Sequence, residues 1–196
     1  MRMIVKYVSS LARTCQRRLR NFAGDQRGVS AVEFAMVLPL MIALYFGTVE
    51  MSQGIGAQRK VSLTTRTIAD LVSQTSNMSN TDMTNSLKAA VAVMAPFSES
   101  NLKVTVSSIA IDANSKATIK WSDTKNGTAR EKNSVVTLPA ALLIANTSLI
   151  WSEVQYSYTP SVGYVISGSV TLKDQLYMRP RLSECVTRES VQTTCS

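Results

Sequence analysis

The stretch that decides the fold is RGVSAVEFAMVLPLMIALYFGTVE, residues 27–50. Within it, the 16 consecutive residues 34–49 carry no charge and are mostly large and apolar. Counted from Ala31 to Glu50, the apolar run forms a helix of about 20 residues, which spans roughly 30 Å, the thickness of a bilayer's hydrocarbon core. The alternative, a helix buried in a soluble core, normally keeps a polar stripe, and Ala35–Phe46 has none. The sequence therefore predicts a membrane-spanning helix.

Basic residues before this helix predict its orientation. Residues 1–28 hold seven Lys or Arg side chains and one acid, Asp25, for a net charge of +6. The first turns after the apolar run offer only Arg59, Lys60 and Arg66. Because cytoplasmic flanks carry the excess of Lys and Arg, we expect the N-terminus in the cytoplasm and the residues from about 51 onward outside.

Glu33 is the residue that does not suit a plain membrane anchor. A carboxylate a few residues inside an apolar span costs on the order of 2–3 kcal/mol unless it meets a cation or stays at the interface. No Lys or Arg lies on the same helical face within the apolar run, so we expect the partner to come from elsewhere. A cut after Gly28 would create an α-amino group at Val29, one helical turn from Glu33. Such a group stays mostly charged at neutral pH, since its ordinary pKa is about 7.7–8.0.

These residues resemble the processing site of type IV prepilins. Residues 28–34, GVSAVEF, fit that superfamily's pattern of a glycine, four residues, a glutamate and an aromatic residue, between a basic leader and an apolar helix. The resemblance implies that a membrane aspartyl prepilin peptidase cuts after Gly28 and makes Val29 the mature N-terminus. It also implies an assembly role for Glu33 and Phe34, with the Glu33 carboxylate paired to the N-terminal amine of a neighbouring subunit.

A closer resemblance is to the TadE-like family of the tight-adherence, or Flp-type, pilus systems. Its members read much like GVSAVEFAMVLPLMIALYFGTVE, and the segments WSEVQYSYTP at 151–160 and YMRPR at 177–181 look like its closing strands. The resemblance implies a minor pilin or pseudopilin of the bacterial inner membrane, with a periplasmic C-terminal domain. Such a protein is needed for pilus assembly, adhesion and biofilm formation. The implied partners are the prepilin peptidase, the major pilin and other minor pilins, the inner-membrane assembly platform and the lipid bilayer.

Two alternatives to a processed pilin stay open. The first alternative to the pilin is an uncleaved single-pass scaffold of the inner membrane that organises the secretion machinery. A signal-peptidase cut after Gly56 or Ala57 is conceivable, because small residues stand there. Glu33 inside the apolar run and the length of that run argue against this cut.

Charge and composition exclude several classes of function. Residues 1–28 hold +6 of the net charge of +8, and the remaining 14 basic and 12 acidic residues leave only +2, so we expect no nucleic-acid partner. The chain has no His, which excludes His-based triads and His metal sites. It also lacks a glycine-rich phosphate loop. We therefore expect no enzymatic activity, no catalytic residue, no cofactor and no metal site.

The domain organisation follows from the membrane segment. We expect a basic cytoplasmic leader at 1–28, a transmembrane helix at 29–53, a periplasmic helix extension at 54–74 and a periplasmic α+β head at 75–196. One continuous helix is expected over 30–74, with Gly54 and Gly56 as a candidate hinge. Pro39 removes one backbone hydrogen bond, so a kink is expected near Ala35–Pro39.

The head is expected to fold as α+β with an antiparallel sheet of about four strands. Turn-prone residues at 73–81 lead into a second helix at 82–95, capped by Asn80 or Thr81. Apolar alternation predicts strands at 102–111, 117–121, 149–158 and 168–178, the last two as an antiparallel pair. A shift of parity in the first strand predicts a bulge near Ser107–Ser108. The polar segment 122–134 is either a solvated connection or a partner-binding loop, and 139–145 is expected to form a short helix.

The cysteines agree with this topology. Cys15 lies in the leader, where the cytoplasm keeps thiols reduced, whereas Cys185 and Cys195 lie in the tail, which is expected to face the oxidising periplasm. We predict a Cys185–Cys195 disulfide. Closing so short a loop is worth about 3 kcal/mol in the chain-entropy model.

Overall fold

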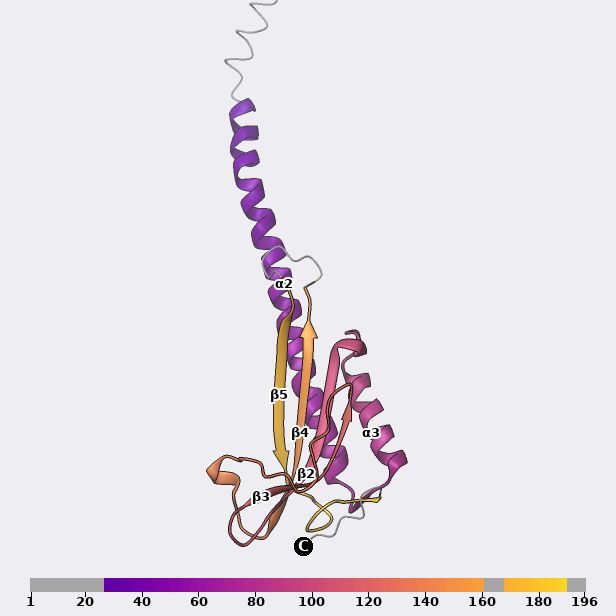
Figure 1. Ribbon diagram of the computed structural model, residues 1–196. Helices are drawn as coiled ribbons and strands as arrows, with labels where there is room; N and C mark the ends of the chain where they lie inside the picture. Colours follow the sequence, from indigo (N-terminus) through magenta and orange to yellow (C-terminus); the bar gives the residue numbers. More distant parts are fainter. Residues whose placement is uncertain (1–26, 161–167, 190–196) are drawn as a thin grey trace, which may run out of the picture. The chain divides into compact units, whose positions relative to one another are not determined.

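The computed structural model describes residues 27–160 and 168–189 of the 196-residue chain. The chain divides into two compact units, residues 1–48 and 49–196. The second unit has the predicted α+β architecture with a four-stranded antiparallel sheet (Figure 1). After helix α2, its helices and strands in chain order are β1 (Asn77–Met78), α3 (Asn80–Val93), β2 (Leu102–Ile111), β3 (Ala117–Lys125), β4 (Thr147–Tyr158), β5 (Val170–Met178) and β6 (Thr187–Arg188).

Helix α2 runs from Arg27 to Ser73, 47 residues without interruption. It supplies the described part of the first unit and the first element of the second. The predicted helix at 30–74 is therefore confirmed, and neither Gly54 nor Gly56 breaks it. Several threonine hydroxyls donate to the carbonyl four residues earlier, which lets α2 bury Thr64 and Thr65 without leaving their hydroxyls unpaired.

The sheet has the strand order β3-β2-β4-β5, and all neighbours are antiparallel. Strands β4 and β5 pair from Tyr158 with Val170 to Ile150 with Met178, which confirms the antiparallel pair predicted from their alternation. A separate parallel pair joins β1 to β6. The sequence did not predict this pair, because two residues are too short to carry a periodic pattern.

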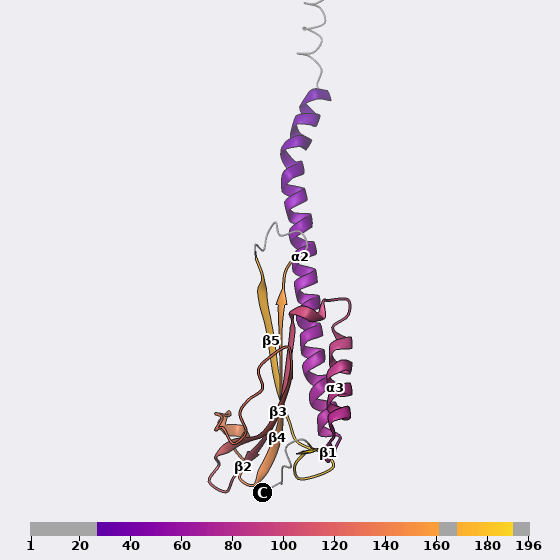
Figure 2. The same ribbon diagram turned by 45° about the vertical axis from the view of Figure 1, so that its right-hand side comes forward.

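The larger hydrophobic core lies between the sheet and its two helices. Helices α2 and α3 cover the same face of the sheet (Figure 2). The apolar positions of α2 that recur every three or four residues, among them Val61 and Ile68, are fully buried there. Each such side chain contributes about 1.5–3 kcal/mol by leaving water. The buried sheet residues of this core are Leu102, Val104, Val106, Trp121, Ile150, Val154, Tyr156 and Tyr158.

A second, smaller core lies on the opposite face of the sheet, at one end of the strands. This cluster contains Ile109 and Ile111 of β2 and Leu149 and Trp151 of β4, and Ile109 pairs with Leu149. The connection between β3 and β4 covers them with Leu138, which is 5% exposed, and with partly buried residues around it. This covering segment includes the 3₁₀ turn Ala140–Leu142, shorter than the helix predicted at 139–145.

The shift of parity in β2 reflects a change in the face that is buried. Val106 faces the helices, whereas Ile109 faces the smaller core. A register shift between β2 and β3 is confirmed at Ser108 and Ile109. Its extra residue, however, is on β3, since Ser108 pairs with Trp121 and Ile109 with Ile119, which leaves Lys120 between them. Strand β2 keeps an unshifted register with β4.

Two other boundaries differ from the prediction. The N-cap of α3 is Ser79, whose hydroxyl accepts from the amide of Asp82, and not Asn80 or Thr81. Strand β3 extends to Lys125, so the predicted loop at 122–134 was wrong over its first four residues. These residues are polar because their face of the sheet is only half-buried: the hydroxyls of Thr124 and Ser122 bond those of Thr105 and Ser107 on β2.

Arg188 ties the C-terminal segment to the sheet. Its guanidinium is 4% exposed and donates to both carboxylate oxygens of Asp123, at 2.9 and 3.2 Å, and to the carbonyl of Met78 at 3.0 Å. Trp121 adds a second link, because its indole nitrogen donates to the carbonyl of Val186 at 2.7 Å. Removing one partner of such a buried pair leaves the polar atoms of the other partner buried without a hydrogen bond.

We expect Arg188→Ala to lower the free energy of unfolding of the second unit by about 2–4 kcal/mol, because Asp123 and the Met78 carbonyl lose a buried donor. Arg181→Ala is the matched control. Arg181 pairs with Asp70, but both side chains are at least 40% exposed, so the loss should be about 0–1 kcal/mol. Denaturant unfolding followed by tryptophan fluorescence measures both variants, since both tryptophans lie in this unit. Equal effects of the two variants would contradict the assignment.

Candidate functional site

The apolar part of α2 is exposed all around its circumference. Every residue from Gly28 to Tyr45 is exposed, including Phe34 at 60% and Met36 at 77%. Among the described residues, α2 is the helix that is long and apolar enough to cross a membrane, and its most apolar stretch has no buried residue. The interpretation as a helix buried in a soluble core is therefore wrong. A surface of this kind suits a lipid environment or a contact with other apolar helices.

The predicted processing and assembly residues lie together at the start of α2. Gly28 and Val29 occupy its first turn, and Glu33 and Phe34 lie one turn further along. The Glu33 side chain is exposed and makes no ion pair or hydrogen bond with the described part of the chain. In the structure of the single chain, therefore, Glu33 has the position but not the partner that the sequence predicts.

Pro39 lies inside α2, and the helix continues through it. Its ring nitrogen has no hydrogen to donate to the carbonyl of Ala35, so one backbone bond of the helix is missing. The kink predicted near Ala35–Pro39 stays a prediction.

A second acid of α2, Glu50, has the opposite environment. Its side chain is 1% exposed, in the second unit of the chain. The Tyr158 hydroxyl donates to Oε1 of Gln53 at 3.5 Å. Burial raises the pKa of Tyr158, and the negative charge of Glu50 raises it further. The sequence analysis placed Glu50 at the end of the apolar run and did not predict its burial, which depends on a strand 100 residues later.

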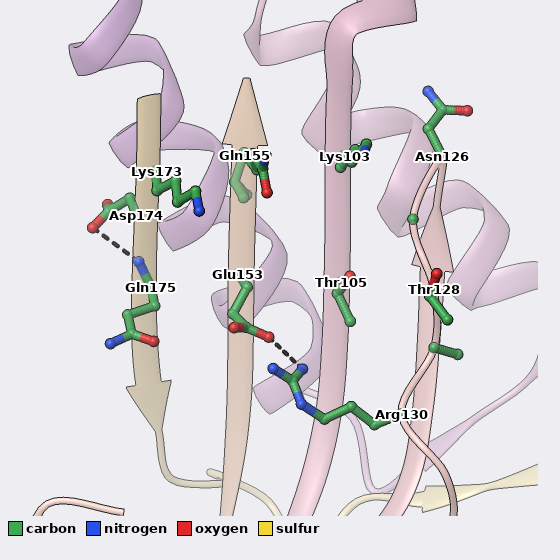
Figure 3. A pocket seen from close by; sticks show the side chains of 13 residues that line it. Lys103, Thr105, Asn126, Thr128, Arg130, Glu153, Gln155, Lys173, Asp174 and Gln175 are labelled. Carbon is green, nitrogen blue, oxygen red and sulfur yellow. Dashed lines mark hydrogen bonds and ion pairs between the residues drawn. The ribbon is translucent and has the colours of Figure 1, made fainter. Parts of the chain in front are cut away.

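A cleft of about 980 Å³ lies on the face of the sheet opposite the helices (Figure 3). Its floor is formed by outward-facing side chains of β2, β4 and β5, and its wall by residues 126–130. Arg130 reaches from this wall to the floor, where it forms an ion pair with Glu153. The cleft was not predicted, because it requires the segment after β3 to fold back over strands that are distant in sequence.

Arg130 also belongs to a stack of flat groups at the edge of this cleft. Its guanidinium carbon lies 3.7 Å from the centre of the Trp151 ring, within range of a cation–π interaction. The Trp151 ring stacks in turn on Tyr177, with 5.4 Å between ring centres. Burial raises the pKa of Tyr177, Glu153 raises it further, and Arg130 lowers it. The Arg130 side chain that crosses the cleft is thus in contact with both the Trp151 ring and the Glu153 carboxylate.

The wall of the cleft is held by the turn at Asn126 and Gly127. The Asn126 amide donates to the carbonyls of Glu99 and Leu102, at 3.2 and 3.0 Å. A Cβ on Gly127 would lie 2.6 Å from the Thr124 hydroxyl oxygen, so only glycine fits without a shift. The sequence analysis placed this pair of residues only within the polar segment 122–134.

Residues 28–70 match the model of the TadE-like protein family, which confirms the predicted resemblance over this segment. A TadE-like segment indicates involvement in tight-adherence pilus assembly, and an N-terminal apolar helix in such a system fits a single-pass membrane protein. No curated protein and no solved structure matches the chain. The match ends before residues 151–160 and 177–181, so their resemblance to the family stays a prediction.

The cysteine of the tail that the structure describes is Cys185. Its side chain is 7% exposed. Cys195 lies outside the described residues, so its pairing with Cys185 stays a prediction. As for metals, the described residues contain no group of three or more His, Cys, Asp or Glu side chains placed to hold an ion.

Alkylation of the unfolded chain tests the pairing. Without reductant, we expect no label on Cys185 or Cys195, because both sulfurs are in the disulfide, and label on both after reduction. Cys15 serves as the internal control wherever the leader is retained, since it should react in both conditions. Peptide mass spectrometry assigns the labels, and labelling of both tail cysteines without reductant would contradict the pairing.

Proposed function

We propose that the chain is a minor pilin or pseudopilin of a tight-adherence pilus. In this proposal α2 anchors the chain in the bacterial inner membrane, with residues 1–28 in the cytoplasm and the second unit in the periplasm. The chain acts in pilus assembly, and through it in adhesion and biofilm formation, by contacts rather than by catalysis. The observation that carries the proposal is Glu33, an acid on an apolar helix with no ion-pair partner among the described residues, within a segment that matches the TadE-like family.

The energetic argument concerns the carboxylate of Glu33. In an apolar environment an unpaired charge is costly, so a cation near Glu33 lowers the free energy of any state in which the helix is surrounded by lipid or other helices. Cleavage after Gly28 supplies one on each processed subunit, the α-amino group of Val29. The positive end of the helix dipole would lie at the same terminus and favours a carboxylate there. Lateral packing of processed helices with an axial offset of about one turn thus brings the amine of one subunit to the depth of a neighbour's Glu33 carboxylate.

Access to the cleavage site is consistent with its position in α2. The Gly28–Val29 bond lies at the second and third residues of the described helix. Terminal turns of helices open at little cost in free energy, so a peptidase can unwind this one without disturbing the rest of α2. The proposed partners are the prepilin peptidase, the major pilin and other minor pilins, the assembly platform and the bilayer.

Processing distinguishes the proposed pilin from an uncleaved membrane scaffold. We expect the intact mass of the chain from membranes to correspond to residues 29–196, and Gly28→Leu to retain residues 1–28, since a larger side chain blocks the residue before the cut. Gly56→Leu is the matched control and should be processed normally, because Gly56 lies far from the site. A mass that still includes residues 1–28 in the unaltered chain would favour the scaffold.

The second test concerns Glu33. We expect Glu33→Ala and the isosteric Glu33→Gln to be processed and inserted normally but to reduce surface pili by about tenfold or more, because the amine loses its counter-charge. Glu131→Gln removes an exposed acid of the second unit and should leave piliation unchanged. Electron microscopy of cells with the chromosomal copy replaced counts the pili. Normal numbers of pili in the Glu33 variants would remove this residue from the mechanism.

A further inference from the structure

The floor of the cleft carries two cations in one row of the sheet. Lys103 on β2 and Lys173 on β5 both pair with Gln155 of the strand between them. Two interstrand spacings separate the lysine Cα atoms, roughly 10 Å. Figure 3 shows the three side chains side by side on the same face. Neither ammonium has a carboxylate within ion-pair distance in the part of the chain that the structure describes.

The acids near this row do not neutralise the two lysines. Glu153 is in the next row, and its carboxylate is paired with Arg130. Asp174 accepts from the backbone amide of Gln175 at 3.0 Å, and its carboxylate points away from β4 (Figure 3). The cleft therefore combines two unpaired positive charges with one internally compensated pair, and it is complementary to an anion.

Neutral polar groups line the rest of the cleft. The side-chain amides of Gln155 and Gln175 and the hydroxyl of Thr128 make no hydrogen bond within the described chain. Amides and hydroxyls both donate and accept, so they suit a ligand that is rich in hydroxyl groups. We propose that this cleft binds an acidic polysaccharide, with Lys103 and Lys173 on its carboxylate or phosphate groups and the amides on its hydroxyls.

The same surface is poorly suited to an acidic peptide. Peptides that bind sheets gain affinity from main-chain hydrogen bonds at a sheet edge and from apolar pockets. Strands β2 and β4 are already paired on both sides, so their backbones offer no such bonds on this floor. The apolar side chains that line the cleft are only Ala129 and Val154, and Val154 belongs to the core on the helix side.

Calorimetric titration of the purified full chain, in an uncharged detergent at low salt, tests the proposal. The probe is a short oligogalacturonate, and the comparison ligands are a maltooligosaccharide and an oligoglutamate of the same length. We expect measurable binding of the oligogalacturonate only. The double variant K103Q/K173Q should weaken it by about tenfold or more, because both counter-charges are lost.

The matched control is K88Q/K116Q, which removes the same charge from exposed lysines outside the cleft and should change affinity by less than about twofold. Equal weakening by both double variants would overturn the site, since it would reflect only the overall charge. Equal binding of the oligoglutamate would overturn the polysaccharide in favour of an acidic peptide. Absence of oligogalacturonate binding would also overturn the proposal, which does not depend on processing or on Glu33.

Discussion

The apolar side chains of the central strands have to be buried on opposite faces of the sheet at the two ends of the strands. Val104 and Val106 of β2 face the helices, whereas Ile109 and Ile111 face the other side. Two helices cover the first face, whereas among the described residues the second face is covered by the connection between β3 and β4. Because this connection covers one end of the strands, the other end stays open as a polar cleft. The shape and chemistry of the cleft are thus set by the need to cover the six apolar strand residues of the smaller core next to it.

Periodicity predicted the parts of the fold that depend on neighbours in sequence. The long helix, the helix with Met83 and Ala90 buried, and the alternating strands were all confirmed within a few residues. The shift of parity in β2 was noticed, but one strand cannot reveal that the reason is a second core. That information lies in Leu138, which follows the strand by almost 30 residues and carries no pattern that links it to Ile109.

The candidate sites also differ in whether the local sequence reveals them or only the folded structure does. Glu33 stands out in the sequence because an acid inside an apolar run is an anomaly of the run itself. Lys103, Gln155 and Lys173 are ordinary residues for exposed strand positions, and only the register of three strands brings them into one row. Arg188 is similar: nothing near it in sequence indicates that Asp123 and Met78 will surround it. Sites whose residues are brought together by the register of paired strands, or by other contacts between distant segments, are therefore visible only in the folded chain.

Two of the three acids of helix α2, Glu33 and Glu50, have different environments. Glu33 is exposed at the apolar end, whereas Glu50 is buried near Tyr158 in the second unit. An acid in contact with its own fold is satisfied within one chain, and an exposed acid on an apolar surface becomes satisfied only by association. The helix thus carries one carboxylate that is buried in its own fold and one that is exposed on its apolar surface.

Strand β5 is an edge of the sheet, and two features affect how that edge meets other proteins. Lys173 stands near its middle, and the Gln58 amide donates to the Lys173 carbonyl at 3.4 Å. A charged side chain and an occupied backbone acceptor both oppose the addition of a foreign strand. Where many copies are crowded in one membrane, this edge resists the fusion of neighbouring sheets into aggregates.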